Sequence, residues 1–366
     1  MKKILILSPE PNIPGGVSNF IKLLDQYLTN RKFEISYVHT GKSYSFIINV
    51  LYPFLIIDQI LKINKKVKVF KPDLVHMNPS LSSIAIIRDF IFLKTINKHK
   101  IPVVFFIHGW QKKLSKKFES PLFKRYFKKR FEMADSIIVL AKEFKEDLIR
   151  LGINSEKVYL SSTMVESANY YPINKEFNKP YTILFCARMK KEKGPFTVLN
   201  AVPQVLNEFP ETKFLFIGSG KDLGELKEKS KEMDLENNVQ FTGYISEKEK
   251  QEYFKKCHIF VFPTEHGEGF PTVILEAMAS GMPLISTAVA GLKDILEDGK
   301  QGLIIKCNPP ESKELSQKII QLLRNENYMK QISKYNINEA KEKYDVKKVC
   351  KKIEAVYLEI NNKKYK

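Results

Sequence analysis

The feature that most constrains the fold of this chain is a regular alternation of short apolar runs with amphipathic helical patterns. A first series of runs comprises Lys3–Leu7, Glu34–His39, Leu74–Met77, Val103–His108 and Ser136–Leu140. A second series comprises Thr182–Ala187, Lys213–Gly218, Val239–Tyr244, Ile259–Pro263 and Pro283–Ser286. Strands that alternate with helices predict a parallel sheet with helices on both faces. Two such series predict an α/β protein with two Rossmann-like, doubly wound parallel-sheet domains.

The stretch between the two series, Tyr170–Tyr181, carries tyrosines and prolines and is typical of a linker. A chain of 366 residues has room for two domains. We therefore expect a first domain over residues 1–172 and a second over residues 173–345. The remaining residues, 346–366, begin with a pattern typical of one amphipathic helix.

Residues that can bind ligands follow several of the expected strands. In open α/β sheets, ligands bind beyond the carboxyl ends of the strands. The candidates at such positions are Pro14-Gly15-Gly16, His108-Gly109-Trp110, Arg188, Lys193-Gly194, Gly218-Ser219-Gly220 and residues 265–281. The sequence therefore predicts ligand sites at these strand ends.

Two cations lie just beyond the first strand of the second series. Arg188 ends this strand, and Lys193 follows five positions later, directly before Gly194. The planar donor fork of arginine and the point charge of lysine together suit a diphosphate. The alternative is that both are ordinary surface cations of a lysine-rich cluster. Their position after a strand favours the diphosphate interpretation.

Two carboxylates, Glu268 and Glu276, lie eight positions apart in the segment EHGEGFPTVILEAMASG, residues 265–281. Pro271 suits the first turn of a helix, so the amides near Thr272 and Val273 would point at an anion. Glu276, about one turn further in, could accept hydrogen bonds from a ribose diol. Glu268 could bind sugar hydroxyls. A nucleoside diphosphate sugar would satisfy all these groups; the alternative is a pair of exposed helix charges.

The same segments resemble the retaining glycosyltransferases of family 4, also called group 1, which have the GT-B fold. Glu268 and Glu276 match the E-x7-E motif of that family, and residues 188–194 match its G-R-L-x-x-x-K-G segment. Further matches, in the order that the family has them, are Gly218-Ser219-Gly220, Phe241–Tyr244, Ala290-Gly291-Leu292, residues 298–302, Pro14-Gly15-Gly16 and His108-Gly109. Together they extend over nearly the whole chain.

The resemblance implies two domains that face a central cleft, a C-terminal helix that returns to the first domain, and retention of anomeric configuration. It also implies a role for each matched residue. Those expected to act in catalysis are His108, Arg188, Lys193 and Glu268. Those expected to bind the donor are Gly15, Gly16, Arg188, Lys193, Gly218, Ile245, Glu268, Gly269, Phe270, Thr272, Val273 and Glu276.

Each implied role rests on a chemical group. Arg188 and Lys193 would hold the diphosphate, Glu276 the ribose, and Ile245 the base. Glu268 and nearby amides would hold the donor sugar, near which His108 would also lie. Gly15 and Gly16 would let the backbone approach the phosphates or the acceptor. Three parts of the sequence depart from the family pattern: Cys186-Ala187, residues 162–166 and Asp294. The donor sugar is therefore not assigned.

No cofactor and no metal requirement is expected. The sequence contains no Asp-x-Asp pair that could present a divalent cation to the diphosphate. Arg188 and Lys193 could supply the positive charge instead. Because Asp-x-Asp is absent, we expect a metal-independent enzyme. We expect UDP as the preferred nucleotide, because it is the more frequent one in the family that the sequence resembles.

The net charge of +19 falls mostly before residue 180 and indicates an anionic partner. Residues 111–130 are rich in lysine and arginine, with Phe118, Leu122, Phe123, Tyr126 and Phe127 among them. Such a stretch could lie on an anionic membrane surface, where a lipid-linked glycan acceptor would also reside. The alternative is a helix with an ordinary solvated basic face. Because the sequence has no known nucleic-acid module, nucleic acid is not expected as a partner.

Three features bear on location. The N-terminal apolar run before Ser8 is too short for a signal peptide. Residues 45–63 are apolar but interrupted, which favours a core helix, with a membrane-surface segment as the second option. The four cysteines show no metal-ligand or redox spacing, which suits a reducing compartment. We therefore expect a cytoplasmic protein, peripheral on the inner face of the cytoplasmic membrane.

The sequence thus predicts a retaining, metal-independent glycosyltransferase that acts in surface polysaccharide biosynthesis. It would move a sugar from a nucleotide-diphosphate sugar to a hydroxyl of a glycan or lipid-linked glycan. Two alternatives stay open: a nucleotide-sugar epimerase of the same fold, and a non-catalytic protein that binds glycan or membrane. A dinucleotide oxidoreductase is disfavoured, because Gly224 does not complete a G-x-G-x-x-G motif after Gly218-Ser219-Gly220. The oligomeric state is not predicted.

Overall fold

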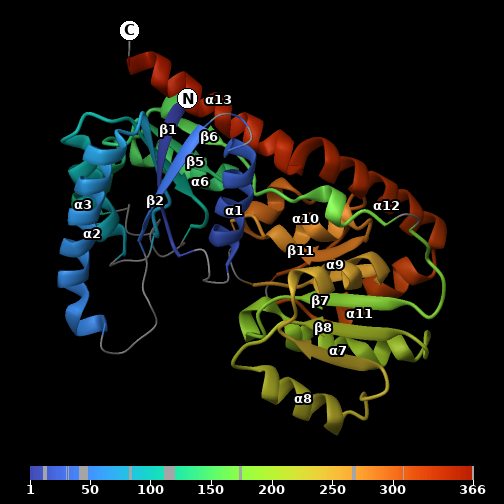
Figure 1. Cartoon of the computed structure of the whole chain (residues 1–366). Coiled ribbons are helices and arrows are strands. Elements are labelled where there is room, and N and C mark those ends of the chain that lie inside the picture. The colour runs from blue at the N-terminus through green and yellow to red at the C-terminus, as the bar shows by residue number, and fades with distance from the viewer. Residues whose placement is uncertain are drawn as a thin grey trace. The chain divides into compact units, whose positions relative to one another are not determined.

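The chain divides into two compact units, which are drawn in Figure 1. The computed structural model describes residues 1–10, 15–29, 31, 33–40, 48–81, 85–110, 120–172, 175–265, 269–307 and 309–364. Unit 1 combines Met1–Thr163 with Val346–Lys366, and unit 2 is the single segment Met164–Asp345. Each unit is described by itself below.

Unit 1 is built on a six-stranded sheet in the order β2-β1-β3-β4-β5-β6. Its strands are β1 (Lys2–Ser8), β2 (Phe33–His39), β3 (Leu74–Met77), β4 (Val103–Ile107), β5 (Ser136–Val139) and β6 (Val158–Leu160). Its described strand pairs are all parallel, and Ile4 of β1 lies between Ile35 of β2 and Leu74 of β3. All five residues of β4 are buried, as expected for a strand covered on both faces.

The helices of unit 1 include one from the far end of the chain. They are α1 (Gly16–Thr29), α2 (Ile48–Phe70), α3 (Ala85–Asn97), α5 (Pro121–Phe131), α6 (Lys142–Leu151) and α13 (Val346–Lys364). Helix α13 packs against α1. It buries Val349, Ile353, Tyr357 and Ile360, which follow one another at helical spacing. The last helix of the chain thus completes the core of unit 1.

Helix α2 differs from the core helix that the apolar residues 45–63 predicted. Ile63 and Val67 are buried, whereas Phe54, Ile57 and Leu61 are exposed, Phe54 by 69 %. The reason is that the apolar residues of α2 occur on more than one side of the helix, so the sheet cannot cover them all. The structure therefore leaves part of this apolar surface uncovered within the described residues.

Unit 2 has a second six-stranded sheet, in the order β12-β11-β10-β7-β8-β9. Its strands are β7 (Thr182–Cys186), β8 (Lys213–Ile217), β9 (Val239–Gly243), β10 (Ile259–Phe262), β11 (Leu284–Thr287) and β12 (Gly302–Ile305). Its α-helices are α7 (Pro195–Leu206), α8 (Leu223–Glu232), α9 (Glu247–Lys256), α10 (Thr272–Ala279), α11 (Ser312–Leu323) and α12 (Glu326–Glu339). The described strand pairs of this sheet are again parallel. The predicted fold of two doubly wound parallel-sheet units is confirmed.

The boundary between the units differs from the predicted one, which followed residue 172. Unit 2 begins at Met164 because residues just after it bond to the end of the same unit. The amide of Val165 donates to the carbonyl of Tyr344 over 3.1 Å, and the Ser167 hydroxyl donates to the Asp345 carboxylate. The two points at which the chain enters and leaves unit 2 are thereby held together.

None of the four cysteines forms a disulfide; Cys257 and Cys350 are buried and Cys186 and Cys307 are half-buried. No helix in the described ranges has both the length and the apolar character that spanning a membrane would require.

Candidate functional site

The loops that follow four neighbouring strands of unit 2 lie together at the carboxyl edge of its sheet. The amide of Met189, after β7, donates to the carbonyl of Ser219, after β8, over 3.0 Å. The amide of Gly218 donates to the carbonyl of Gly243, at the end of β9, over 2.9 Å. The amide of Glu265, after β10, donates to the carbonyl of Glu192 over 3.0 Å. This edge carries most of the residues that the sequence singled out.

Two glycines allow these loops to pack so closely. Gly218 has a φ of +132°, and a Cβ there would lie 2.0 Å from the Ala187 carbonyl oxygen. Gly194 has a φ of +82°, and a Cβ there would lie 2.2 Å from the Pro263 carbonyl oxygen. Both backbone conformation and close approach therefore require glycine. These contacts give Gly218 a packing role. Its role in donor binding stays a prediction.

The predicted cations Arg188 and Lys193 are brought together at this edge. Arg188 is exposed just beyond β7, whereas Lys193 ends a short 3-10 turn, η3 (Lys191–Lys193), and is only 7 % exposed. Burial, together with the charge of Arg188, lowers the pKa of Lys193 to about 8, and the Glu192 carboxylate opposes this shift. A desolvated ammonium beside a second cation favours an anionic ligand.

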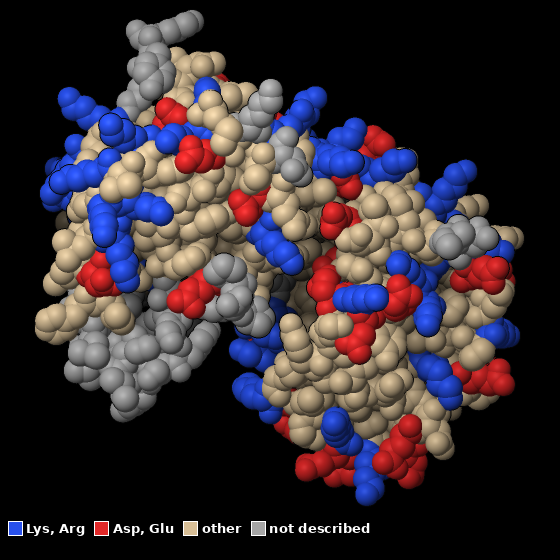
Figure 2. All heavy atoms as spheres, in the orientation of Figure 1, with Lys and Arg blue, Asp and Glu red and all other residues tan. Residues whose placement is uncertain are grey.

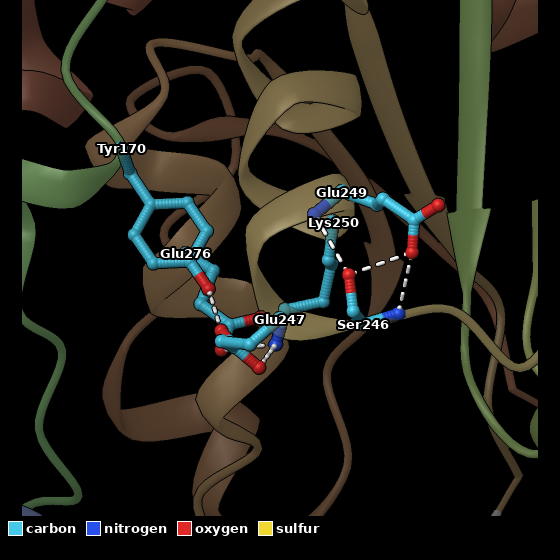
Figure 3. Close-up of polar contacts among 6 residues, drawn as sticks. All are labelled: Tyr170, Ser246, Glu247, Glu249, Lys250 and Glu276. Carbon is cyan, nitrogen blue, oxygen red and sulfur yellow. Dashed lines mark hydrogen bonds and ion pairs between the residues drawn. The ribbon is translucent and has the colours of Figure 1, made fainter.

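Glu276 lies inside helix α10 and is 4 % exposed, so the alternative of an exposed helix charge is wrong for it. Its Oε1 accepts a hydrogen bond from the Nζ of Lys250 on α9 over 2.9 Å (Figure 3). The same Nζ lies 2.9 Å from Oε2 of Glu247. A carboxylate has further lone pairs, so Glu276 keeps capacity to accept bonds from a diol.

Tyr170 completes this cluster from the segment at which the chain enters unit 2 (Figure 3). Its hydroxyl donates to Oε1 of Glu247 over 2.6 Å and also interacts with the Glu276 carboxylate. Burial raises the pKa of Glu276, and the Lys250 ammonium opposes that shift. Burial alone would lower the pKa of Lys250, but Glu276 and Glu247 outweigh it and raise that pKa. The pair is therefore an ion pair of ammonium and carboxylate.

Residues around the start of α10 lie where the sequence placed them, with one shift. Pro271 occupies the N-cap position rather than the first turn, and α10 begins at Thr272. The amides of Thr272 and Val273 belong to the first turn of α10, where backbone N–H groups can face an anion. Gly269 and Phe270 are buried, and the Phe270 ring packs on Tyr344 with centroids 5.5 Å apart. Glu268 and His266 lie outside the described residues.

Ile245 is half-buried just after β9, in the turn before α9. Helix α9 begins with a capping box: the Ser246 hydroxyl accepts from the Glu249 amide, and the Glu249 carboxylate accepts from the Ser246 amide. This box fixes the start of the helix that carries Lys250.

His108 lies in unit 1, directly after β4, and is half-buried. Its Nε2 is 2.8 Å from Oδ1 of Asn78, and its ring stacks on Phe106 with centroids 4.5 Å apart. Burial lowers the pKa of His108 to about 3. Gly15 and Gly16 are exposed at the start of α1, and a Cβ on either would meet no described atom within 4 Å.

The basic stretch 111–130 falls only partly on described residues, since 111–119 lie outside them. From Ser120 onwards it forms helix α5, in which Phe127 and Phe131 are buried. Leu122 is 81 % exposed, and Phe123, Lys124 and Arg125 are exposed as well. On the face drawn in Figure 2, Lys and Arg side chains gather over unit 1.

The sequence did not reveal several residues that contact the predicted ones. Lys250 and Glu247 belong to a run of alternating charges that reads as a solvated helix face. Tyr170 and Asn78 carry no motif of their own. The capping box at Ser246 and Glu249 is a signal that could have placed the start of α9 after Ile245, but it does not give the direction in which Lys250 points. Within the described residues, no group of three or more His, Cys, Asp or Glu side chains could hold a metal ion.

The family of the chain follows from comparison with known proteins. Residues 168–339 match the family described as glycosyl transferases group 1, and residues 14–167 match glycosyltransferase family 4. These matches cover the two units in turn. The chain belongs to the group 1 glycosyltransferases, and its two parallel sheets form the GT-B fold.

Two curated relatives share about a quarter of their residues with this chain over about half of its length. A phosphatidyl-myo-inositol mannosyltransferase of Mycobacterium tuberculosis is 27 % identical over 179 residues, 48 % of this chain and 46 % of its own length. An amylovoran biosynthesis glycosyltransferase of Erwinia amylovora is 24 % identical over 185 residues, 49 % of this chain and 46 % of its own. The chain thus spans about half the length of these relatives.

Among solved structures, HepE of Anabaena in complex with UDP and glucose superimposes with a TM-score of 0.72 at 16 % identity. The superposition covers 97 % of this chain and 99 % of HepE. At this identity the likeness establishes the fold and no more.

Proposed function

We propose that the chain is a retaining glycosyltransferase that moves a sugar from a nucleoside-diphosphate sugar to a hydroxyl of a glycan or lipid-linked glycan. One observation carries this proposal: Arg188, the buried Lys193 and the buried Glu276 all belong to the carboxyl edge of one parallel sheet. Two cations suit a diphosphate, and a held carboxylate suits a ribose diol.

The residues support a metal-free mechanism. Charge that develops on the departing diphosphate would be stabilised by Arg188 and Lys193. The amides of Thr272 and Val273 at the start of α10 would add further donors. We propose UDP as the nucleotide, which the complex of HepE with UDP supports by analogy of fold alone.

The acceptor proposed is a membrane-linked glycan in surface polysaccharide biosynthesis. Helix α5 presents Leu122 and Phe123 beside Lys124 and Arg125, and α2 presents Phe54, Ile57 and Leu61. Exposed apolar side chains among cations suit an anionic lipid surface. The mannosyltransferase relative, whose name includes phosphatidyl-myo-inositol, supports a lipid-borne acceptor. We accordingly place the protein at the inner face of the cytoplasmic membrane.

The test of transfer is an assay with UDP-sugars and a panel of glycan and lipid-linked acceptors, with and without EDTA. The proposal expects acceptor-dependent release of UDP that EDTA does not stop, and a product whose anomeric configuration, read by NMR, matches the donor. Release of an altered nucleotide sugar without an acceptor would instead establish the epimerase. Binding without turnover, under any acceptor, would favour the non-catalytic protein.

The membrane proposal has its own test. Flotation with vesicles that contain phosphatidylglycerol should carry the protein to the top of the gradient, whereas neutral phosphatidylcholine vesicles should not. A Leu122→Ser, Phe123→Ser variant should lose flotation, while Ile149→Ser, which removes an exposed apolar residue of α6, should not. Equal flotation of the wild type with both vesicle types would contradict an anionic surface as the partner.

A further inference from the structure

A chain of hydrogen bonds in unit 1 connects the C-terminal helix to His108. Tyr357 of α13 bonds through its hydroxyl to Nδ1 of His76, a residue of β3. Nε2 of His76 lies 3.0 Å from Oδ1 of Asn78, just beyond β3. The same Oδ1 lies 2.8 Å from Nε2 of His108. The order is therefore Tyr357, His76, Asn78, His108.

The orientation of the Asn78 amide is fixed independently of the histidines. Its Nδ2 donates to the carbonyl oxygen of Leu7 over 2.9 Å, and a backbone carbonyl can only accept. Nδ2 must therefore face Leu7, and Oδ1 must face both imidazole rings. An amide oxygen is an acceptor without a proton to give.

The protons of both histidines follow from this. Because Oδ1 of Asn78 only accepts, Nε2 of His76 and Nε2 of His108 must each carry a hydrogen. A neutral imidazole has one proton, so Nδ1 of each ring is an acceptor. At His76 this acceptor takes the Tyr357 hydroxyl. At His108 no described residue bonds to Nδ1.

The surroundings of the two rings disfavour the imidazolium form. Phe106 stacks on His76 with centroids 5.6 Å apart, and also on His108, whereas Phe20 meets the His108 ring edge-on at 4.9 Å. Burial lowers the pKa of His76 to about 4 and that of His108 to about 3, the latter also through the charge of His76. Both rings are therefore neutral in the physiological range.

We propose that Asn78, His76 and Tyr357 are positioning residues that hold His108 as the neutral Nε2–H tautomer, so that its Nδ1 accepts a hydrogen bond from a hydroxyl of the sugar. That the hydroxyl belongs to a sugar rests on the proposed function, whereas the tautomer of His108 does not. In this role His108 orients a hydroxyl and neither donates a proton nor supplies positive charge. Helix α13, remote in sequence, contributes to the site through Tyr357.

The tautomer is read directly by two-bond proton–nitrogen NMR of the full chain labelled with ¹⁵N-histidine, with His108 assigned by the spectrum of His108→Gln. The proposal expects the Nε2–H pattern for His108, unchanged between pH 8 and pH 5. The Nδ1–H pattern, or titration of His108 within that range, would overturn it. Since no substrate is present, this result is independent of whether the chain transfers sugar.

The positioning residues are tested by variants that break the chain. Asn78→Ala and Tyr357→Phe should each shift the His108 signal toward a mixture of tautomers. Asn64→Ala is the matched control, because Asn64 makes a similar bond to His99, 2.8 Å long, elsewhere in unit 1. A His108 spectrum in Asn78→Ala identical to that of the wild type would sink the assignment. Thermal unfolding of each variant separates this effect from loss of fold.

With an active preparation, Asn78→Ala should lower kcat by about tenfold, the value of one oriented hydrogen bond, while UDP affinity changes by less than about twofold. His108→Gln, which keeps an acceptor, should retain more activity than His108→Ala. Equal loss in both would contradict the acceptor role. If UDP does not bind to the wild type, the proposed function fails, whereas the tautomer result still stands.

Discussion

At the scale of single residues, the most informative group of unit 2 is Lys193, because burial and a neighbouring cation both act on it. Its pKa is about 8 in the free protein. A bound diphosphate stabilises the ammonium form and therefore raises this pKa. At a pH above the pKa of Lys193 in the ligand-free protein, binding must take up a proton. The affinity for the diphosphate therefore falls as the pH rises.

We expect UDP affinity to fall between pH 8 and pH 10, approaching tenfold per pH unit, since one proton is taken up per ligand. Calorimetry across that range measures the slope. Lys193→Arg should remove it, because a guanidinium stays charged throughout. A wild-type affinity that does not change across this range would show that Lys193 does not contact the diphosphate.

Glu276 and Lys250 are coupled by burial, so removal of one partner leaves a charge without compensation. Lys250→Ala should lower the free energy of unfolding by about 3 kcal/mol, measured by urea denaturation. Lys300→Ala is the control. Lys300 and its partner Glu297 are both exposed, so their ion pair should contribute less than about 1 kcal/mol. Similar losses in the two variants would mean that the buried pair is not intact in solution.

At the scale of elements, the packing of the loops beyond β7 and β8 depends on Gly218. A Cβ there would collide with the Ala187 carbonyl, and φ lies in a region that favours glycine. Gly218→Ala should lower the free energy of unfolding by about 2–4 kcal/mol. Gly224→Ala in α8, where a Cβ would meet nothing within 4 Å, should be neutral or stabilising. Equal Tm values for both variants would refute this packing role.

The elements themselves could be predicted to different degrees. All ten expected strands exist, and the central ones, such as β4 and β10, are continuous buried apolar runs. The two missed strands, β6 and β12, are at the edges of their sheets, and β6 has only three residues, of which two are not buried. A strand as short as β6 lacks the apolar signal that periodicity detects, whereas β12 has the apolar sequence GLII and its signal was missed.

The site could be predicted where function leaves a local signal, and not where it depends on three-dimensional packing. Arg188, Lys193 and Glu276 follow expected strands in the sequence, so their place near the carboxyl edge of the sheet could be predicted, whereas their roles stay predictions. Lys250 and Tyr170 reach Glu276 from other elements, and no spacing in the sequence encodes that contact. The same holds for Asn78, which lies just beyond β3 and bonds to Leu7 of β1, His76 of β3 and His108 just beyond β4.

At the scale of the whole molecule, the two units differ in the number of chain segments that form them. Unit 2 is one uninterrupted segment, Met164–Asp345, and it contains Arg188, Lys193 and Glu276. Unit 1 needs both ends of the chain, because α13 buries a row of its side chains there. A segment with its own complete sheet and core should fold alone.

We therefore expect residues 164–345, produced alone, to unfold cooperatively on heating and to bind UDP. The complementary truncation, which ends the chain at residue 345, should lower the Tm of unit 1, since the apolar surface that Val349, Ile353 and Tyr357 cover becomes exposed. Differential scanning calorimetry measures both. Failure of the 164–345 segment to give any cooperative transition would show that the units depend on each other for folding.

Calorimetric titration in metal-free buffer would establish whether the carboxyl edge of the unit 2 sheet binds a nucleoside diphosphate without metal. In metal-free buffer, UDP should bind more tightly than UMP, and Arg188→Ala should weaken UDP by about tenfold or more. Lys213→Ala, which removes an exposed lysine at the start of β8 on the opposite edge, should leave the affinity unchanged. If neither UDP, GDP nor ADP binds, or if both variants bind UDP equally well, the account is contradicted.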